Sequence, residues 1–167
     1  MNSTENEFLA LIESNKGIIR KVSRTYMDTR DDQADLEQEI IYQLWKSYDS
    51  FQHQSSFSTW MYRVALNTAL VFYKKEKKKL TVDREIPTDI ISEENTSAVK
   101  DLQLSHFYKA IQKLERIEKA LVLLHLENYS HKEIGENLGI SEGNARIKLS
   151  RAKEKLKTLI KQQGYEF

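Results

Sequence analysis

Two polar stripes within residues 35–79 carry side chains whose types and spacing could do chemistry. In the first stripe, Asp35, Gln38, Glu39 and Tyr42 recur at intervals that place them on one side of an α-helix. Carboxylate and amide groups gathered in this way suit a basic protein partner. The alternative interpretation is a solvated helix face, which is common for polar stripes.

The second stripe combines an aromatic ring, a guanidinium, an amide and an ammonium group. Its members are Trp60, Arg63, Asn67 and Lys74, and a lysine cluster continues to Lys79. Such groups stack on bases, pair with phosphates and read base edges, so the stripe predicts a nucleic-acid contact. A basic helix with aromatic residues can also lie on a membrane surface or be solvated without a ligand.

A third candidate surface lies at the start of a helix that we expect from Glu142 onwards. Its exposed face presents Gly143, Arg146, Ile147 and Ser150, flanked by Asn144, Lys148 and Arg151. Seven basic residues and one acidic residue lie between positions 146 and 161. Because a helix N-terminus also favours phosphate, this surface predicts DNA binding.

The side chains needed for catalysis or metal binding do not form a recognised pattern. The four histidines are scattered through the chain at positions 53, 106, 125 and 131, without H-x-x-x-H spacing. Phosphate-binding, dinucleotide-binding and nucleophile-elbow glycine motifs do not occur in the sequence. We therefore predict no enzyme activity, no catalytic residues, no metal site and no cofactor.

Composition favours a helical protein of the cytoplasm. The 167 residues include one proline and five glycines, and 40% of them are hydrophobic. The chain has no cysteine and so no disulfide framework. It shows no signal peptide and no apolar run near the ~18 residues of a membrane span, so we expect no membrane insertion. The C-terminal part, residues 106–167, has a net charge of +4, against −3 for residues 1–73.

Helices must position the two stripes of residues 35–79. A first helix is expected over residues 5–27, with Gly17 as the point where it kinks or splits. Residues 28–33 are expected to form a polar loop. A helix starting near Asp35 would bury a face led by Leu36, Ile40 and Leu44. The next helix would start around Ser58, with Phe57 as a hydrophobic staple.

The C-terminal part is predicted to contain a helix-turn-helix. Residues 80–104 contain the one proline and few large apolar side chains, which predicts a flexible linker, with a short helix near its end as an option. Helical periodicity returns from Ser105. Ser130 and Glu133 form a capping box for a helix through Leu138, Gly139 ends it, and Ser141 caps the next helix. The expected buried positions are Phe107, Ala110, Ile111, Leu114, Ile117, Ala120, Leu121, Leu124 and Leu126, followed by Ala145, Leu149, Ala152, Leu156 and Leu159.

Two strings of the sequence resemble regions of the bacterial sigma factors of the extracytoplasmic-function (ECF) type, within the sigma-70 family. ADLEQEIIYQLWKSYDSF followed by FSTWMYRVALNTAL looks like region 2 of that family, and YSHKEIGENLGISEGNARIKLSRAKEKLK looks like region 4. The chain departs from the family pattern at Glu115, usually Pro, at Gly135, usually Ala, and at Ile147, where a small polar residue is common. The departure at Ile147 leaves the base preference open.

The resemblance implies two small helical domains, 1–79 and 105–167, joined by the linker 80–104. It implies a sigma factor that binds core RNA polymerase at the clamp of the largest subunit and the flap of the second largest. Promoter DNA, and an anti-sigma factor as a further candidate, would be the other partners. The implied polymerase contacts are Asp35, Gln38, Glu39 and Trp45. The implied contacts to the −10 element are Ser56, Phe57, Ser58, Thr59, Trp60, Arg63, Asn67, Lys74 and Lys75. The implied contacts to the −35 element are Glu142, Asn144, Arg146, Ile147, Lys148, Ser150 and Arg151.

Two other classes of function remain open at this stage. A helix-turn-helix regulator that acts as a homodimer, independently of polymerase, would use the acidic stripe as a dimer face and bind a palindromic site. A structural or adaptor protein would use its basic helices to bind RNA or membranes, and would require the region 2 resemblance to be accidental.

Overall fold

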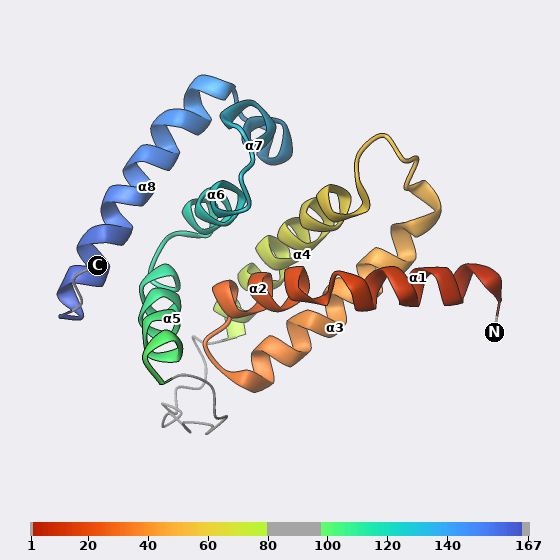
Figure 1. Ribbon diagram of the computed structural model, residues 1–167, viewed down its shortest axis with the longest axis horizontal. Coiled ribbons are helices and arrows are strands. Elements are labelled where there is room, and N and C mark those ends of the chain that lie inside the picture. The colour runs from red at the N-terminus through yellow and green to blue at the C-terminus, as the bar shows by residue number, and fades with distance from the viewer. Residues whose placement is uncertain (1, 80–97, 165–167) are drawn as a thin grey trace. The chain divides into compact units, whose positions relative to one another are not determined.

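The computed structural model describes residues 2–79 and 98–164, with side chains for 2–72 and 99–164. The chain divides into two compact units, Met1–Glu85 and Ile86–Phe167. Every regular element in the described ranges is a helix (Figure 1). The prediction of an all-α protein with two helical units is therefore confirmed. Of the predicted linker, residues 80–97 lie outside the described residues.

The N-terminal unit is built from four α-helices and one short 3₁₀ helix. These are α1 (Ser3–Ser14), α2 (Lys16–Tyr26), α3 (Arg30–Ser47), η1 (Tyr48–Ser50) and α4 (Phe57–Lys79). Helices α2, α3 and α4 all pack against one another. The predicted core face of α3 is confirmed, because Leu36, Ile40 and Leu44 are fully buried. They meet Met61, Ala65 and Leu66 of α4 in one core.

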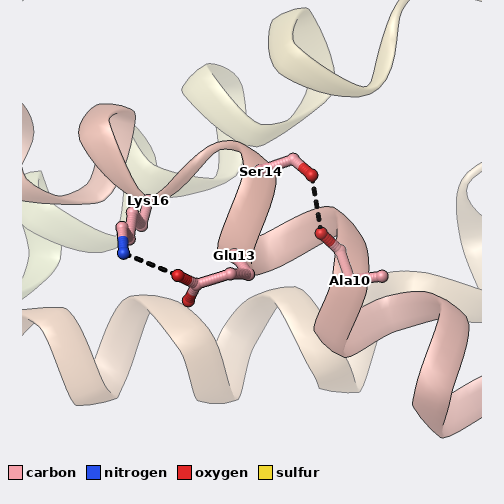
Figure 2. A network of polar contacts seen from close by, with 4 residues as sticks. All are labelled: Ala10, Glu13, Ser14 and Lys16. Atoms are coloured by element: carbon pink, nitrogen blue, oxygen red, sulfur yellow. Dashed lines mark hydrogen bonds and ion pairs between the residues drawn. The ribbon is translucent and has the colours of Figure 1, made fainter.

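The first predicted helix divides at Asn15 and not at Gly17. Asn15 has non-helical backbone angles, and its side-chain amide donates to the Leu11 carbonyl. Figure 2 shows the two polar contacts around the break: Ser14 Oγ donates to the Ala10 carbonyl at 2.9 Å, and Lys16 Nζ lies 2.6 Å from Glu13 Oε1. The break thus coincides with the non-helical backbone of Asn15, where local side-chain hydrogen bonds compete with continuation of the helix.

Two predicted helix starts need correction. Helix α3 begins at Arg30, five residues before Asp35, so the predicted loop 28–33 is mostly helical. Its cap is Thr29, whose hydroxyl accepts the Asp32 N–H at 3.2 Å, and acidic residues in the first turn favour the helix dipole. Helix α4 begins at Phe57. Because Ser56 is the capping residue, Phe57 is the first helical residue and cannot be the staple that precedes the cap.

The C-terminal unit contains α5 (Ala98–Ile111), α6 (Arg116–Leu126), α7 (His131–Leu138) and α8 (Glu142–Gln162). Helix α5 begins seven residues before the predicted start of this domain, so residues 98–104 of the predicted linker are helical. Helix α8 packs against α5, α6 and α7, and is the long blue helix of Figure 1. Its buried positions include Ala145, Leu149, Ala152 and Leu156, as predicted, with Ile160 buried and Leu159 only half-buried.

The buried residues of α6 are consecutive residues in the middle of the helix and do not form a stripe along one face. The six residues from 119 to 124 are all buried. Ile117 and Leu126 were predicted to be buried, but their exposed fractions are 38% and 53%. The prediction was wrong because α6 is enclosed around most of its circumference, so its ends and not one face meet solvent.

The helix-turn-helix prediction is confirmed in detail. Ser130 and Glu133 exchange the two hydrogen bonds of a capping box, at 3.2 and 2.8 Å. Gly139 has a φ of 72°, which glycine adopts without steric cost, and it ends α7. Ser141 then caps α8 by accepting the Asn144 N–H at 3.1 Å. The turn passes close to α7, because a Cβ on Gly135 would lie 2.7 Å from the Ile140 carbonyl oxygen.

Candidate functional site

The acidic stripe of α3 remains accessible in the folded unit. Asp35, Gln38 and Tyr42 are exposed, and Glu39 is half-buried. Glu39 Oε1 accepts a hydrogen bond from Gln43 Nε2 at 2.9 Å, which holds its carboxylate along the helix surface. Within the described part of this unit, no helix buries Asp35, Gln38 or Tyr42, so these side chains can meet a partner without rearrangement of the core.

An open groove beside this stripe was not predicted. Its volume is about 590 Å³, and it is lined by Glu5, Phe8, Leu9, Gln38, Ile41, Tyr42 and Trp45. The groove therefore joins α1 to the accessible side of α3. Trp45, which the family resemblance assigned to polymerase contact, is 42% exposed here. The signal that could have revealed the groove is the pair Ile41 and Tyr42, apolar residues off the predicted core face.

A network of aromatic rings runs from α1 to the start of α4. Phe8 lies 4.9 Å from Trp45 between ring centroids, and Trp45 stacks on Tyr48 at 6.5 Å. Tyr48 in turn contacts Trp60 at 6.3 Å. Burial among these rings raises the pKa of the Tyr48 hydroxyl, and the Glu7 carboxylate adds to the shift. The acidic side and the elbow before α4 are thus connected through packed side chains.

The elbow between η1 and α4 carries three linked hydroxyl groups. Ser56 Oγ accepts the Thr59 N–H at 3.2 Å, lies 3.1 Å from Ser58 Oγ and donates to Thr59 Oγ1 at 3.0 Å. Ser56 is exposed, whereas Ser58 and Thr59 are half-buried. Three of the predicted −10 contacts therefore share one capping arrangement, which fixes the start of α4.

Phe57 and Trp60 have a structural role in this elbow. Trp60 is half-buried, with ring centroids 5.0 Å from Phe51 and 5.5 Å from Phe57. Phe51 also contacts His53, at 4.5 Å. His53 has a φ of 55°, a left-handed conformation that is uncommon for residues other than glycine. Packed rings and a constrained backbone give the elbow a defined shape.

Arg63 and Asn67 lie on the accessible side of α4. Both side chains are exposed, while Met61, Tyr62 and Leu66 of the same helix are buried. The two residues are one helical turn apart, so they form a short polar edge that continues from the elbow. Lys74 and Lys75 belong to α4, but their side chains lie outside the part of the chain whose side chains are described.

All seven predicted −35 contacts are exposed on the first three turns of α8: Glu142, Asn144, Arg146, Ile147, Lys148, Ser150 and Arg151. The opposite side is anchored by Ala145, Leu149 and Ala152, which are at most 1% exposed. Arg146 lies 3.5 Å from the Glu142 carboxylate, one turn earlier. Both side chains of this ion pair are largely exposed, so it stabilises the helix only weakly.

Two further structural facts bear on function. Among the residues that the structure describes, no three His, Cys, Asp or Glu side chains are grouped to hold a metal ion. No helix within 2–79 or 98–164 combines the length and the apolar character needed to cross a bilayer.

Both units match sequence families of the sigma-70 type. Residues 11–79 match Sigma-70 region 2, and residues 106–156 match Sigma-70 region 4. The two matches follow each other in chain order. The first contains the whole of α2, α3 and α4, and the second contains α6, α7 and α8 as far as residue 156.

Relatives are similar over most of the chain. An ECF RNA polymerase sigma-E factor of Haemophilus influenzae is 28% identical over 144 residues, covering 79% of this chain and 76% of the relative. The ECF RNA polymerase sigma factor SigW of Bacillus subtilis is 25% identical over 169 residues, covering 94% of this chain and 90% of the relative.

Solved structures share the fold. The sigma factor RpoE of Bartonella quintana, crystallised with the anti-sigma factor NepR, superposes with a TM-score of 0.68 at 20% identity, covering 96% of this chain and 98% of that one. CnrH, in complex with the cytosolic domain of CnrY, gives a TM-score of 0.66 at 20% identity, with 95% and 90% coverage.

Proposed function

We propose a function for this chain from its family membership: it belongs to the ECF-type sigma factors of the sigma-70 family. It binds core RNA polymerase, directs the enzyme to promoters and enables transcription to start. The chain itself contributes no catalysis, and it acts in the cytoplasm, where the polymerase works. The matches to both sigma regions disfavour a homodimeric regulator that acts without polymerase.

The N-terminal unit docks on polymerase through the acidic side of α3. Asp35, Gln38 and Glu39 supply carboxylate and amide groups for the basic surface of the clamp. Trp45 adds a large, partly exposed ring at the edge of the groove. Aromatic rings are frequent energetic centres of protein interfaces, so Trp45 is the expected apolar anchor of this contact.

The elbow and α4 capture the −10 element as it opens. Arg63 and Asn67 present a guanidinium and an amide next to the hydroxyl groups of residues 56–59. A base turned out of the duplex would be held by stacking and by hydrogen bonds in this region. Stacking contributes roughly 1–3 kcal/mol per base, which suffices to trap a strand that opens transiently. Lys74 and Lys75 are proposed to hold the duplex upstream.

Helix α8 reads the −35 element in the major groove. Asn144, Arg146 and Lys148 are exposed on its first turns, and we expect them to contact base edges, with Arg151 on phosphate. Two modest DNA contacts held on one polymerase gain strength through their effective concentration. Region 4 would also meet the flap of the second largest subunit. The anti-sigma factor in the Bartonella quintana structure makes such a protein a further candidate partner.

One observation carries this proposal most directly. The acidic row on α3 and the polar edge on α4 are both exposed, while the facing sides of the same two helices form a single core. The unit can therefore present two surfaces at once without exposing its interior. A solvated face alone would not explain an aromatic groove beside one surface and an elbow of packed rings and capping hydroxyl groups beside the other.

The test is run-off transcription with core polymerase and this protein on a library of promoters with randomised upstream sequence. We expect discrete transcripts whose start sites share a two-part upstream sequence. Core polymerase alone serves as the baseline, and a variant with Asp35, Gln38 and Glu39 changed to alanine is the matched control. Transcripts no more abundant than with core polymerase alone would overturn the proposed function.

A further inference from the structure

Ile147 is the large apolar side chain on the exposed face of α8. Its exposed fraction is 52%, and it is surrounded along the helix surface by Gly143, Asn144, Ser150 and Arg151, which lie one turn away on either side. Glycine has no side chain and serine a short one, and space around the Cβ position of Gly143 is open. Ile147 therefore protrudes beyond Gly143 and Ser150 towards whatever this face binds.

The position of Ile147 is not explained by the core of its unit. Ala145, Leu149 and Ala152 occupy the buried face of the same helix and are at most 1% exposed. A single exposed apolar residue is ordinary on a protein surface. Ile147 differs from such cases because it stands between Arg146 and Lys148, within the surface that is proposed to enter the major groove.

The major groove contains one kind of apolar feature that Ile147 can recognise. Each base pair presents hydrogen-bond donors and acceptors there, and thymine alone adds a methyl group at C5. An isoleucine side chain neither donates nor accepts a hydrogen bond, so it would leave the polar edge of a cytosine or guanine unpaired in a contact that excludes water. Contact with thymine removes apolar surface from water on both sides.

We propose that Ile147 selects a thymine in the −35 element through contact with its C5 methyl group. This inference rests on the proposed function, because it requires α8 to lie in the major groove of a promoter. It names the base that Ile147 recognises, and Ile147 is the residue that stands where a small polar residue is common in the family. Arg146 and Asn144 would recognise neighbouring bases through hydrogen bonds.

The experiment compares thymine with deoxyuridine, which differs from it by the methyl group alone. The −35 sequence is first selected from the randomised promoter library with the polymerase–protein complex. Each thymine of the selected element is then replaced singly by deoxyuridine, and open-complex formation is measured with the wild-type chain and with Ile147→Ala. Leu126→Ala is the matched control, because Leu126 on α6 is 53% exposed and lies outside α8.

At one thymine, removal of the methyl group should lower open-complex formation by the wild-type complex about three- to fivefold. The same replacement should have no effect with Ile147→Ala, and Leu126→Ala should respond as the wild type does. A selected element without thymine, or a methyl effect of equal size in Ile147→Ala, would overturn the inference. The inference would also fail if the deficit of Ile147→Ala relative to the wild type were as large on the deoxyuridine promoter as on the thymine promoter. Failure of the proposed function looks different, since no promoter would then be selected.

Discussion

The two units present their candidate surfaces in different ways. In the N-terminal unit each surface draws on several elements: the acidic side joins α1 to α3, and the −10 side joins the elbow to α4. In the C-terminal unit the proposed reading surface lies on consecutive turns of α8. The first arrangement depends on packing between elements, whereas the second depends on one helix and its buried stripe.

This difference predicts how substitutions should behave. Tyr48 contacts both Trp45 and Trp60, so the two surfaces of the N-terminal unit share aromatic packing. A change in that packing should affect the stability of the unit and both of its contacts. On α8, the exposed side chains do not support the fold, so their replacement should alter DNA recognition alone.

The largest expected effect is on stability, and it tests whether packing between rings of several elements supports the elbow. Trp60→Ala should lower the free energy of unfolding of the N-terminal unit by about 2–3 kcal/mol, because it removes a half-buried ring from contact with several others. Chemical denaturation followed by circular dichroism measures this change. Arg63→Ala, one turn along the exposed side of α4, is the control and should leave stability within about 0.5 kcal/mol. A Trp60→Ala variant as stable as the wild type would show that the N-terminal surface does not depend on packing between elements.

A smaller effect is expected at the cap of the reading helix. Ser141→Ala should destabilise the C-terminal unit by about 1 kcal/mol, since the Asn144 N–H loses its acceptor. Ser150→Ala is the matched control on the exposed face of the same helix and should not destabilise the unit. Thermal unfolding of the two variants distinguishes these outcomes. Equal destabilisation by both would show that exposed positions of α8 also support the fold.

The salt dependence of promoter binding tests whether Arg151 of α8 contacts a DNA phosphate. Arg151→Ala should reduce the slope of log affinity against log salt concentration by about 1, as expected for one lost phosphate contact. Lys157→Ala is the control, because Lys157 lies late on the helix and pairs with Glu154 at 3.5 Å. Titration of the polymerase–promoter complex with salt gives the slopes. An unchanged slope for Arg151→Ala would place this residue away from phosphate.

The smallest expected effect concerns pH and the C-terminal unit. Partial burial lowers the pKa of His125, and the charges of Lys153 and His131 lower it further. Because the folded state then binds its proton less readily than the unfolded chain, His125 contributes stability above about pH 6.5 that is lost as pH falls. His125→Gln should therefore lose less thermal stability than the wild type between about pH 7 and pH 5. Identical profiles for His125→Gln and the wild type would contradict this account.

The sequence predicted α8 more completely than any other element. A capping serine, a regular apolar stripe and a left-handed glycine are local signals, and each determines a boundary or a face without reference to other elements. Ser130, Gly139 and Ser141 all act as predicted. The exposed side then follows directly, because helical periodicity places it opposite Ala145, Leu149 and Ala152.

The N-terminal surfaces were less predictable because they depend on contacts between distant segments. Helical spacing identified Asp35 and Gln38 as exposed, but it could not show that Phe8 and Leu9 of α1 would form a groove beside them. Likewise, Trp60 lies on the predicted stripe, yet its contacts with Phe51 and Tyr48 come from the path of the elbow. The predicted burial of α6 residues was wrong in part for the same reason, because packing of α6 against α7 and α8 outweighs the local apolar pattern.

The central claim is that α3 and α4 bind different partners, polymerase and opened promoter. Its most direct test measures core polymerase affinity and promoter opening for two variants, Asp35→Ala/Gln38→Ala/Glu39→Ala and Arg63→Ala/Asn67→Ala. We expect the first to weaken polymerase binding by about tenfold or more, and the second to keep that affinity within about twofold while opening fails. Undiminished polymerase binding by the first variant, or an equal loss of polymerase binding in both, would contradict the account.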